Sequence, residues 1–274
     1  MRPGLRIALL EARLSGELAA LVRRYGAEPH CVPAVREEEK DCREEISGLL
    51  DQLRAEASTI FVFSTGVGVD ALFAVARRLG RLGELEDALR RGTAVCRGPK
   101  PAAALKRVGL AASVMVKPPY TTGDLVLALE PIQMAGRSVV LVHYGERNVP
   151  LVSALEVRGA RLRELMLYEW RLPEDVGPVR ELIAQIIEGG FAAVVFTSQI
   201  QARHLFRIAA EMGLAEALRE ALLGRTVVAA VGPTCARALA ELGVSPDVVP
   251  ENPKMGSMLF ALSRRLAAGT EAGP

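Results

Sequence analysis

Short apolar runs alternate with longer segments of helical periodicity along most of the chain. Between the runs, apolar residues recur at spacings of three and four, as in Leu18-Leu21-Val22 and Leu214-Leu218-Leu222. The runs predict strands, and the periodic segments predict amphipathic helices. This alternation is typical of parallel sheets covered by helices on both faces. The predicted strands are Ile7–Leu10, Ile60–Phe63, Val114–Val116, Val139–Val142, Val194–Phe196 and Val227–Val231.

The chain contains two copies of one unit. Phe63-Ser64-Thr65 ends one apolar run, and Phe196-Thr197-Ser198 ends another about 133 residues later. After one extra residue, Gly98-Pro99 aligns with Gly232-Pro233. We therefore expect an α/β protein with two doubly wound, flavodoxin-like parallel-sheet domains that arise from an internal repeat.

Composition narrows the classes of function. The 274 residues include 34 Lys+Arg and 32 Asp+Glu, and 50% are hydrophobic. This balance predicts a well-buried globular protein without the basic surface that duplex nucleic acid requires. The apolar runs are far shorter than the roughly 20 residues of a membrane span. The first residues contain no secretion signal, so we expect a cytoplasmic protein.

Metal binding and disulfide bonds are not indicated. Cys31, Cys42, Cys96 and Cys235 form no C-x-x-C pair, and the three histidines are not spaced with cysteines or carboxylates as metal ligands would be. His30 and His204 lie in apolar surroundings that favour a structural role. We expect neither a metal site nor a disulfide framework.

Five loops that follow predicted strands carry the candidate chemistry. In open parallel sheets, ligands bind beyond the carboxyl ends of the strands, where helix N-termini favour anions. Each loop alone also fits a helix cap or turn, but their number favours a site for carboxylates or phosphates. The loops are Ser64–Gly68, Cys96–Lys100, His143–Arg147, Thr197–Gln199 and Gly232–Thr234.

Other catalytic motifs fit poorly. Gly66–Ala71 matches the dinucleotide fingerprint, but the acidic residue that should end a second strand is missing, because Glu84 and Glu86 lie in a helical segment. No Ser-His-Asp order, nucleophile elbow, H-E-x-x-H motif or Walker loop occurs. A nicotinamide cofactor and hydrolytic chemistry are therefore disfavoured.

Tyr168 is the most distinctive candidate side chain. We expect it at the end of a strand, Leu165–Tyr168, before Trp170 and the connection Pro173–Gly177. Its phenol could pack in a core between the domains, or it could present a weak acid to a cleft. The residues alone leave both interpretations open.

Taken together, these motifs resemble the uroporphyrinogen-III synthase family over about residues 5 to 266. Their order and spacing carry the resemblance rather than any single motif. Two departures occur: Cys235 stands where the family often has a second threonine, and Lys100-Pro101 stands where it often has a threonine. The supporting stretches are Phe63–Val67 and Phe196–Ser198, which are similar to the family's F-T-S loops, Tyr168, and the glycine-proline-threonine loop within Ala230–Thr234.

The resemblance implies a domain organisation. One domain would comprise residues 1–35 with 174–266, the other residues 38–171, and residues 267–274 would form a tail. Two strands would link the domains. The repeat explains how this arrangement can arise, since equivalent segments of the two copies can substitute for one another.

The resemblance also implies a reaction. Hydroxymethylbilane, a linear tetrapyrrole with eight carboxylates, would be cyclised in the interdomain cleft to uroporphyrinogen III, with inversion of ring D through a spiro intermediate and release of water. No metal or redox cofactor takes part. Hydroxymethylbilane synthase could hand the substrate over transiently, and we expect a monomer that binds neither nucleic acid nor membrane.

The residue roles come from the same resemblance. Tyr168 would be catalytic and would assist the departure of the substrate hydroxyl. A catalytically inactive relative that binds a tetrapyrrole or an anion as a regulator remains an alternative, as does a two-domain binding protein for small anions. The expected substrate-binding residues are Arg13, Ser64, Thr65, Gly66, Gly98, Arg147, Thr197, Ser198, Gln199, Gly232, Pro233 and Thr234.

Overall fold

The computed structural model describes residues 4–268, which divide into two compact units. Unit 1 contains the residues up to Arg36 and from Arg171 onward, and unit 2 contains Glu37–Trp170. The chain therefore passes between the units twice. None of the helices within the described residues is long and apolar enough to cross a membrane.

Unit 1 is built on a parallel sheet in the order β11-β10-β1-β2. Val248 extends this sheet through an isolated parallel bridge to Ala229. With Val248 in fifth place, the order of the strands along the chain is the flavodoxin-like 2-1-3-4-5. The strands are β1 (Arg6–Leu9), β2 (Glu28–Cys31), β10 (Ala193–Phe196) and β11 (Val227–Ala230).

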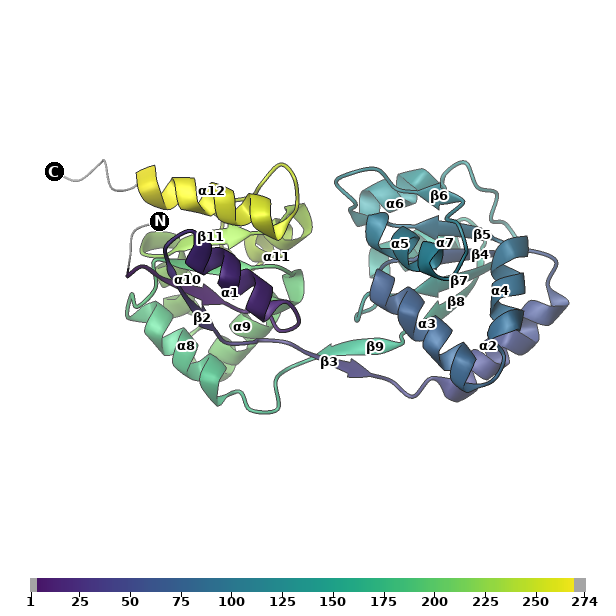
Figure 1. Cartoon of the computed structure of the whole chain (residues 1–274), viewed down its shortest axis with the longest axis horizontal. Helices are drawn as coiled ribbons and strands as arrows, with labels where there is room; N and C mark the ends of the chain where they lie inside the picture. The colour runs from purple at the N-terminus through teal and green to yellow at the C-terminus, as the bar shows by residue number, and fades with distance from the viewer. Residues whose placement is uncertain (1–3, 269–274) are drawn as a thin grey trace. The chain divides into compact units, whose positions relative to one another are not determined.

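Helices cover both faces of the unit 1 sheet (Figure 1). Successive side chains of a strand point to opposite faces. Ile7 and Leu9 accordingly pack with α1 and α12, whereas Ala8 and Leu10 pack with α8 to α11. The helices are α1 (Ser15–Arg24), α8 (Gly177–Ile187), α9 (Gln199–Glu211), α10 (Ala215–Gly224), α11 (Pro233–Glu241) and α12 (Met255–Ala268).

Unit 2 is built on a five-stranded parallel sheet in the order β6-β5-β4-β7-β8. Every residue of β4 and β7 is buried, as expected for strands covered on both sides. The strands are β4 (Thr59–Phe63), β5 (Thr93–Cys96), β6 (Val114–Met115), β7 (Ser138–Val142) and β8 (Arg161–Leu165).

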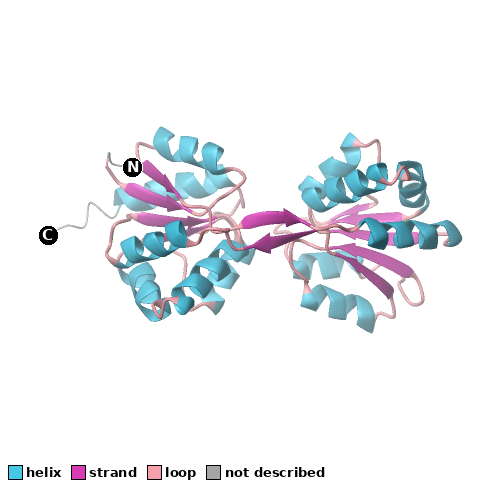
Figure 2. Cartoon of the chain, turned by 90° about the horizontal axis from the view of Figure 1, so that it is seen from below, coloured by secondary structure: helices cyan, strands magenta, loops and turns pink. Residues whose placement is uncertain are grey.

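Two hydrophobic cores hold the helices of unit 2 against this sheet. Phe61 and Phe63 pack with α2 to α5, and Ile60 and Val62 pack with α6 and α7 on the opposite face. The strands thus lie between two groups of helices (Figure 2). The helices are α2 (Arg43–Ala55), α3 (Gly66–Arg78), α4 (Leu82–Arg91), α5 (Pro99–Arg107), α6 (Thr122–Leu129) and α7 (Val149–Val157).

The internal repeat explains the two strand orders. The first copy contains β1, β2, β4, β5 and β6, and the second contains β7, β8, β10, β11 and Val248. Each unit combines the first two strands of one copy with the last three of the other. Unit 2 therefore has the same spatial arrangement as unit 1, although its chain order is 3-2-1-4-5. The predicted fold class, doubly wound α/β units from an internal repeat, is confirmed.

Both crossings of the chain lie in a two-stranded sheet of β3 (Arg36–Glu39) and β9 (Tyr168–Arg171). The expected strand Leu165–Tyr168 is wrong. β8 ends at Leu165, and Tyr168 is the first residue of β9, because the backbone leaves the parallel sheet in the two residues between them. Next to this pair, the backbone N–H of Lys40 donates to the Leu167 carbonyl at 3.1 Å.

The expected tail from residue 267 is partly wrong, because α12 continues through Ala268. The remaining residues of that segment, 269–274, lie outside the described part of the chain.

Candidate functional site

Each of the five predicted loops follows a strand of a parallel sheet and leads into a helix. In each unit, these loops therefore collect at the carboxyl edge, the edge at which the parallel strands end. The unit 1 edge holds the loops after β1, β10 and β11, and the unit 2 edge holds those after β4, β5 and β7. The predicted site residues thus form two sets, one in each unit.

Tyr168 and Thr65 form a buried hydroxyl pair in unit 2. Tyr168 is 1% exposed, belongs to the core between the sheet and α2 to α5, and lies with its hydroxyl 2.9 Å from Thr65 Oγ1. Thr65 is the N-cap of α3 and accepts the backbone N–H of Gly68 at 3.0 Å. Burial raises the pKa of the Tyr168 phenol well above its usual value. The phenol therefore remains protonated and can serve as a hydrogen-bond donor.

An aromatic cluster surrounds this pair. The Tyr168 ring meets Trp170 edge-on at 5.6 Å between centroids, and Trp170 meets Tyr144 in the same way at 5.6 Å. Gly145 lies against the indole with φ of 62°, and a Cβ there would stand 2.1 Å from Trp170 Cδ1. Only glycine fits this position without displacing the indole. Trp170 Nε1 is buried and has no hydrogen-bond partner in the part of the chain that the structure describes.

Arg97 follows β5 at the same carboxyl edge. Its guanidinium lies 5.3 Å from the centroid of the Tyr144 ring, and burial lowers its pKa. The next residue, Gly98, is the N-cap of α5, and a Cβ on it would lie 3.3 Å from the Tyr120 ring. A Cβ on Gly66 would lie 3.0 Å from the Lys100 carbonyl, so the starts of α3 and α5 pack closely. Gly66 and Gly98 thus permit close approach of the backbone.

The loop after β7 contains a network of charged groups. His143 is 1% exposed, its Nε2 lies 2.8 Å from Glu164, and its Nδ1 accepts the backbone N–H of Asn148 at 3.3 Å. Arg147 donates two hydrogen bonds to Glu164, at 2.8 and 2.7 Å, and these hold the pKa of that carboxyl below its usual range. Burial lowers the pKa of His143. The predicted binding residue Arg147 is therefore half-exposed and already paired with a carboxylate.

In unit 1, the loop after β10 is internally hydrogen-bonded. The Thr197 hydroxyl donates to Glu11 Oε2, and Gln201 Nε2 donates to the same oxygen at 3.1 Å. Gln201 Oε1 in turn accepts the backbone N–H groups of Thr197 at 2.8 Å and Ser198 at 3.3 Å. The donors that the sequence assigns to an anion are thus bonded within the protein, beside a carboxylate that lies two residues after the end of β1.

The other predicted residues of unit 1 lie at the same carboxyl edge. Gly232 is the N-cap of α11, and a Cβ there would lie 2.7 Å from Pro253 Cβ. Pro233 begins that helix, and Thr234 follows with an exposed side chain. Arg13 is exposed in the turn between β1 and α1. Gln199 is the first residue of α9.

Ser64 and Cys235 are buried beside the predicted loops. Ser64 is 4% exposed, and its backbone N–H donates to the Val142 carbonyl at 3.2 Å. Cys235 Sγ lies 3.6 Å from the Phe196 carbonyl, and burial raises the pKa of its thiol to about 12. Cys235 is therefore a neutral side chain of the core rather than a reactive thiol.

Three polar residues of these edges were not among the sequence candidates: Glu11, Arg97 and Gln201. Gln201 stands three residues after Ser198, which is the spacing of a capping box, and α9 begins with one. Glu11 follows the first predicted strand directly, and Arg97 precedes Gly98 within a predicted loop. No group of three or more His, Cys, Asp or Glu side chains that could hold a metal ion occurs within residues 4–268.

Comparison with known families agrees with this geometry. A family model described as uroporphyrinogen-III synthase HemD matches residues 16–259, which is most of the chain. The chain belongs to the uroporphyrinogen-III synthase family. The resemblance in the sequence is therefore confirmed at the level of the family.

Individual relatives also match over most of the chain. A putative uroporphyrinogen-III synthase of Methanothermobacter thermautotrophicus is 32% identical over 77% of this chain and 79% of its own length. A Bacillus subtilis protein named "Uncharacterized protein YjjA" is 29% identical over 95% of this chain and 96% of its own. A crystal structure of a mutant uroporphyrinogen III synthase from Thermus thermophilus is 31% identical, covers 97% of this chain and 100% of that chain, and has a TM-score of 0.78.

Proposed function

We propose that this protein is a uroporphyrinogen-III synthase, a lyase that converts hydroxymethylbilane to uroporphyrinogen III and water. Membership of the family supports the class of reaction. The observation that carries the proposal is the Tyr168–Thr65 pair, a buried and protonated phenol bonded to the hydroxyl that caps α3. This pair provides hydrogen-bond donation to a departing hydroxyl at a position suited to anions.

The proposed reaction begins when the carbon–oxygen bond of the terminal hydroxymethyl group breaks and leaves an azafulvene on that ring. The last ring then attacks through its substituted carbon to form a spiro intermediate, which fragments and closes with ring D inverted. The hydroxyl leaves as water. Because the unaided bilane closes without inversion, the protein's main task is to impose a conformation and to assist the departure of the hydroxyl.

Thr65 provides the proposed link between Tyr168 and the substrate. A hydroxyl has one proton and two lone pairs. If Tyr168 donates to Thr65, the Gly68 N–H and the phenol occupy both lone pairs of Thr65 Oγ1, and the Thr65 proton is left to donate outward. Because burial disfavours the phenolate, we assign Tyr168 hydrogen-bond donation rather than full proton transfer.

The carboxyl edge of each sheet, taken by itself, offers groups that suit carboxylates of the bilane. Backbone N–H groups at the starts of α3, α5, α9 and α11 suit them, and each hydrogen bond contributes about 0.5–1.5 kcal/mol. Thr234 is exposed and could add a side-chain donor. Arg147 would exchange its Glu164 partner for a carboxylate of the substrate, and Thr197 would exchange Glu11.

A coupled assay tests the proposal. Hydroxymethylbilane is generated in situ, the purified protein is added, and the products are oxidised and separated into type I and type III isomers. Predominant type III is the expected result. Type I alone, formed at the spontaneous rate, would reject the activity and favour a relative that binds a tetrapyrrole without converting it.

A further inference from the structure

The guanidinium of Arg97 has no polar partner among residues 4–268. Burial lowers the pKa of its guanidinium, and within the described residues this group forms no ion pair or hydrogen bond. Its contact with a charged or aromatic group is the Tyr144 ring, 5.3 Å away. A cation–π contact offsets only part of the cost of removing a guanidinium from water.

Several other arginines of unit 2 have polar partners. Arg81 bonds Asp51 and Glu84, Arg107 bonds both carboxylate oxygens of Asp70, and Arg158 donates to three backbone carbonyls. In contrast, the partly buried guanidinium of Arg97 is unpaired within the described residues. This position therefore carries a cost in stability. Such a cost is typical of groups reserved for a ligand.

The polar side chains that act electrostatically on Arg97 are the phenols of Tyr144 and Tyr168. No side chain caps α5, and Pro99 and Pro101 contribute no N–H, so the donors at the helix start are the backbone groups of Gly98 and Lys100. The start of α3 packs against Lys100, which brings Gly66 and the Thr65 cap to the same edge. An anion here would meet the guanidinium and two helix N-termini.

We propose that Arg97 and the start of α5 form a binding site for a carboxylate. On the proposed function, on which this assignment of the ligand rests, the carboxylate belongs to a side chain of the tetrapyrrole. The guanidinium presents two parallel N–H groups whose spacing matches the two oxygens of a carboxylate. Arg97 then positions the substrate within the cluster that contains Tyr168, since Tyr144 contacts both the guanidinium and Trp170.

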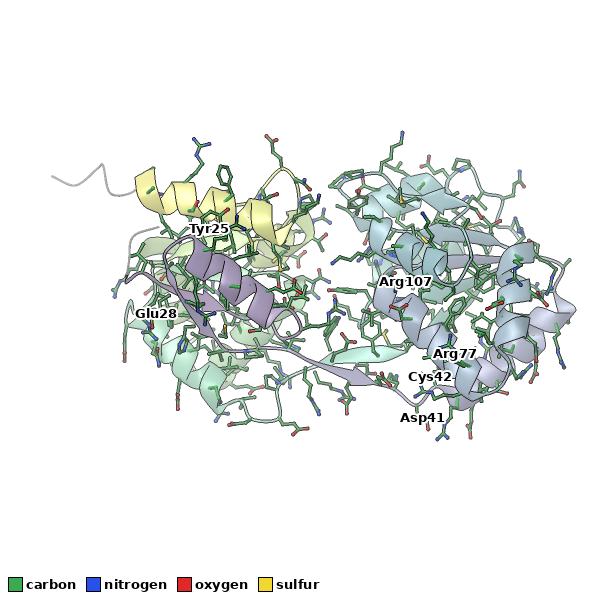
Figure 3. All side chains as sticks on the ribbon, viewed as in Figure 1. Tyr25, Glu28, Asp41, Cys42, Arg77 and Arg107 are labelled. Atoms are coloured by element: carbon green, nitrogen blue, oxygen red, sulfur yellow. The ribbon has the colours of Figure 1, made fainter. Side chains whose placement is uncertain are left out.

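The single tryptophan of the chain provides the assay. Trp170 lies against Tyr144, so its fluorescence reports ligands that bind beside Arg97. The probe is uroporphyrin III, a stable oxidised compound with the same eight carboxylates as the proposed product. Affinities are measured by fluorescence quenching for the wild type, Arg97→Gln, Arg97→Lys and the control Arg107→Gln. Arg107 lies at the far end of α5, is 60% exposed in its side chain and carries the same charge (Figure 3).

Arg97→Gln is expected to weaken porphyrin binding about ten- to hundredfold, because it removes a charge-assisted hydrogen-bond pair. Arg97→Lys should fall between Arg97→Gln and the wild type, since it keeps the charge without the bidentate fork. Arg107→Gln should bind like the wild type. Equal affinity of Arg97→Gln and the wild type would overturn the proposal.

Thermal unfolding separates this role from a structural one. Without ligand, Arg97→Gln should melt at the wild-type temperature or above it, because no internal hydrogen bond or ion pair is lost. Porphyrin should raise the melting temperature of the wild type more than that of the variant. A marked fall in the melting temperature of the unliganded variant would assign Arg97 to stability and overturn the proposal.

Two further results distinguish the sources of failure. Inorganic phosphate should compete poorly with the porphyrin, and competition at equal concentration would replace the carboxylate assignment with a phosphate site. If Arg97→Gln loses binding while the wild type yields only type I isomer, the proposed function fails and the carboxylate site stands. If the wild type yields type III and Arg97→Gln binds normally, the carboxylate site fails and the function stands.

Discussion

Replacement of Tyr168 by phenylalanine removes one oxygen from a packed and buried position. The ring contacts with Trp170 are retained, and Thr65 keeps the Gly68 N–H that it accepts as the N-cap of α3. The lost interaction is the 2.9 Å hydrogen bond between the two hydroxyls. Tyr168→Phe therefore changes a single contact.

The structure sets the expected size of the effects. One hydrogen bond between neutral groups contributes about 0.5–1.5 kcal/mol, so the free energy of unfolding should fall by about 1 kcal/mol. In a chain of this size, that corresponds to a decrease of roughly 2–4 °C in the melting temperature. If Tyr168 supports donation to the departing hydroxyl, turnover should fall about tenfold or more, because one preorganised hydrogen-bond donor to developing charge typically contributes about 10² or more.

The assay compares kcat in the coupled reaction with the affinity for uroporphyrin III. The expected pattern is a slower turnover with the affinity for uroporphyrin III changed by less than about threefold. The reason is that the phenol is assigned to the departure of the hydroxyl and not to the binding of substrate or product. Thr65→Ser should retain most activity, whereas the double variant Thr65→Val with Tyr168→Phe should lose little more than Thr65→Val alone. Unchanged turnover in Tyr168→Phe would show that the phenol takes no part in the departure of the hydroxyl and would leave Tyr168 as a core residue.

Three further substitutions test other parts of the structure. Glu11→Gln removes a negative charge that contacts the loop after β10, so it should tighten porphyrin binding by about 1 kcal/mol, or about fivefold. Weaker binding of the porphyrin to this variant, measured by calorimetry, would contradict an anion-binding role for this loop. Burial lowers the pKa of His204 below its usual value of 6.5, so as the pH falls the imidazole is protonated in the unfolded chain before it is protonated in the folded one, and the folded state loses stability. His204→Asn should therefore reduce the dependence of the free energy of unfolding in urea on pH, between pH 7 and pH 5, by up to about 1.4 kcal/mol per pH unit. An unchanged slope would count against a buried, neutral His204. Gly145→Ala should displace Trp170 and lower the free energy of unfolding more than Gly136→Ala does, because Gly136 has a similar positive φ but open space around it. Equal losses of stability in the two variants, or an unshifted Trp170 emission spectrum, would show that small movements of the neighbouring atoms accommodate the added Cβ.

The buried strands were predictable from the sequence because they are covered on both faces. Strands such as β4 and β7 are apolar at nearly every position, and the helices between them carry one apolar stripe each. The repeat predicted that equivalent loops would occupy equivalent edges. Thr65 and Ser198, which occupy equivalent positions in the two copies, are the N-caps of α3 and α9.

The polar strands and the exchange of segments were harder to predict. β3 has the sequence Arg-Glu-Glu-Glu, which lacks any apolar alternation, and it is a strand because β9 pairs with it. The apolar run from Leu165 to Tyr168 reads as one strand, although it spans the end of β8 and the start of β9. The hydrophobicity of these residues indicates that they are buried, but not whether they continue in one strand. It therefore does not show where β8 ends and β9 begins.

The polar contacts of the candidate site depend on residues far apart in the sequence. Glu11 and Gln201 are separated by 190 positions, yet both bond the loop after β10. Thr65 and Tyr168 are separated by 103 positions. Their residue types suggested chemistry, but the hydrogen bonds that determine which donors are free follow from tertiary packing alone.

As a uroporphyrinogen-III synthase, the proposed function of this protein, it would control which isomer forms. The most direct measurement is the fraction of type III isomer as the protein concentration is raised at a constant supply of hydroxymethylbilane. This fraction should rise from that of the spontaneous reaction to nearly all of the product, and Tyr168→Phe should require more protein to reach the same fraction. A type III fraction that stays at the spontaneous level at every protein concentration would contradict the proposed function.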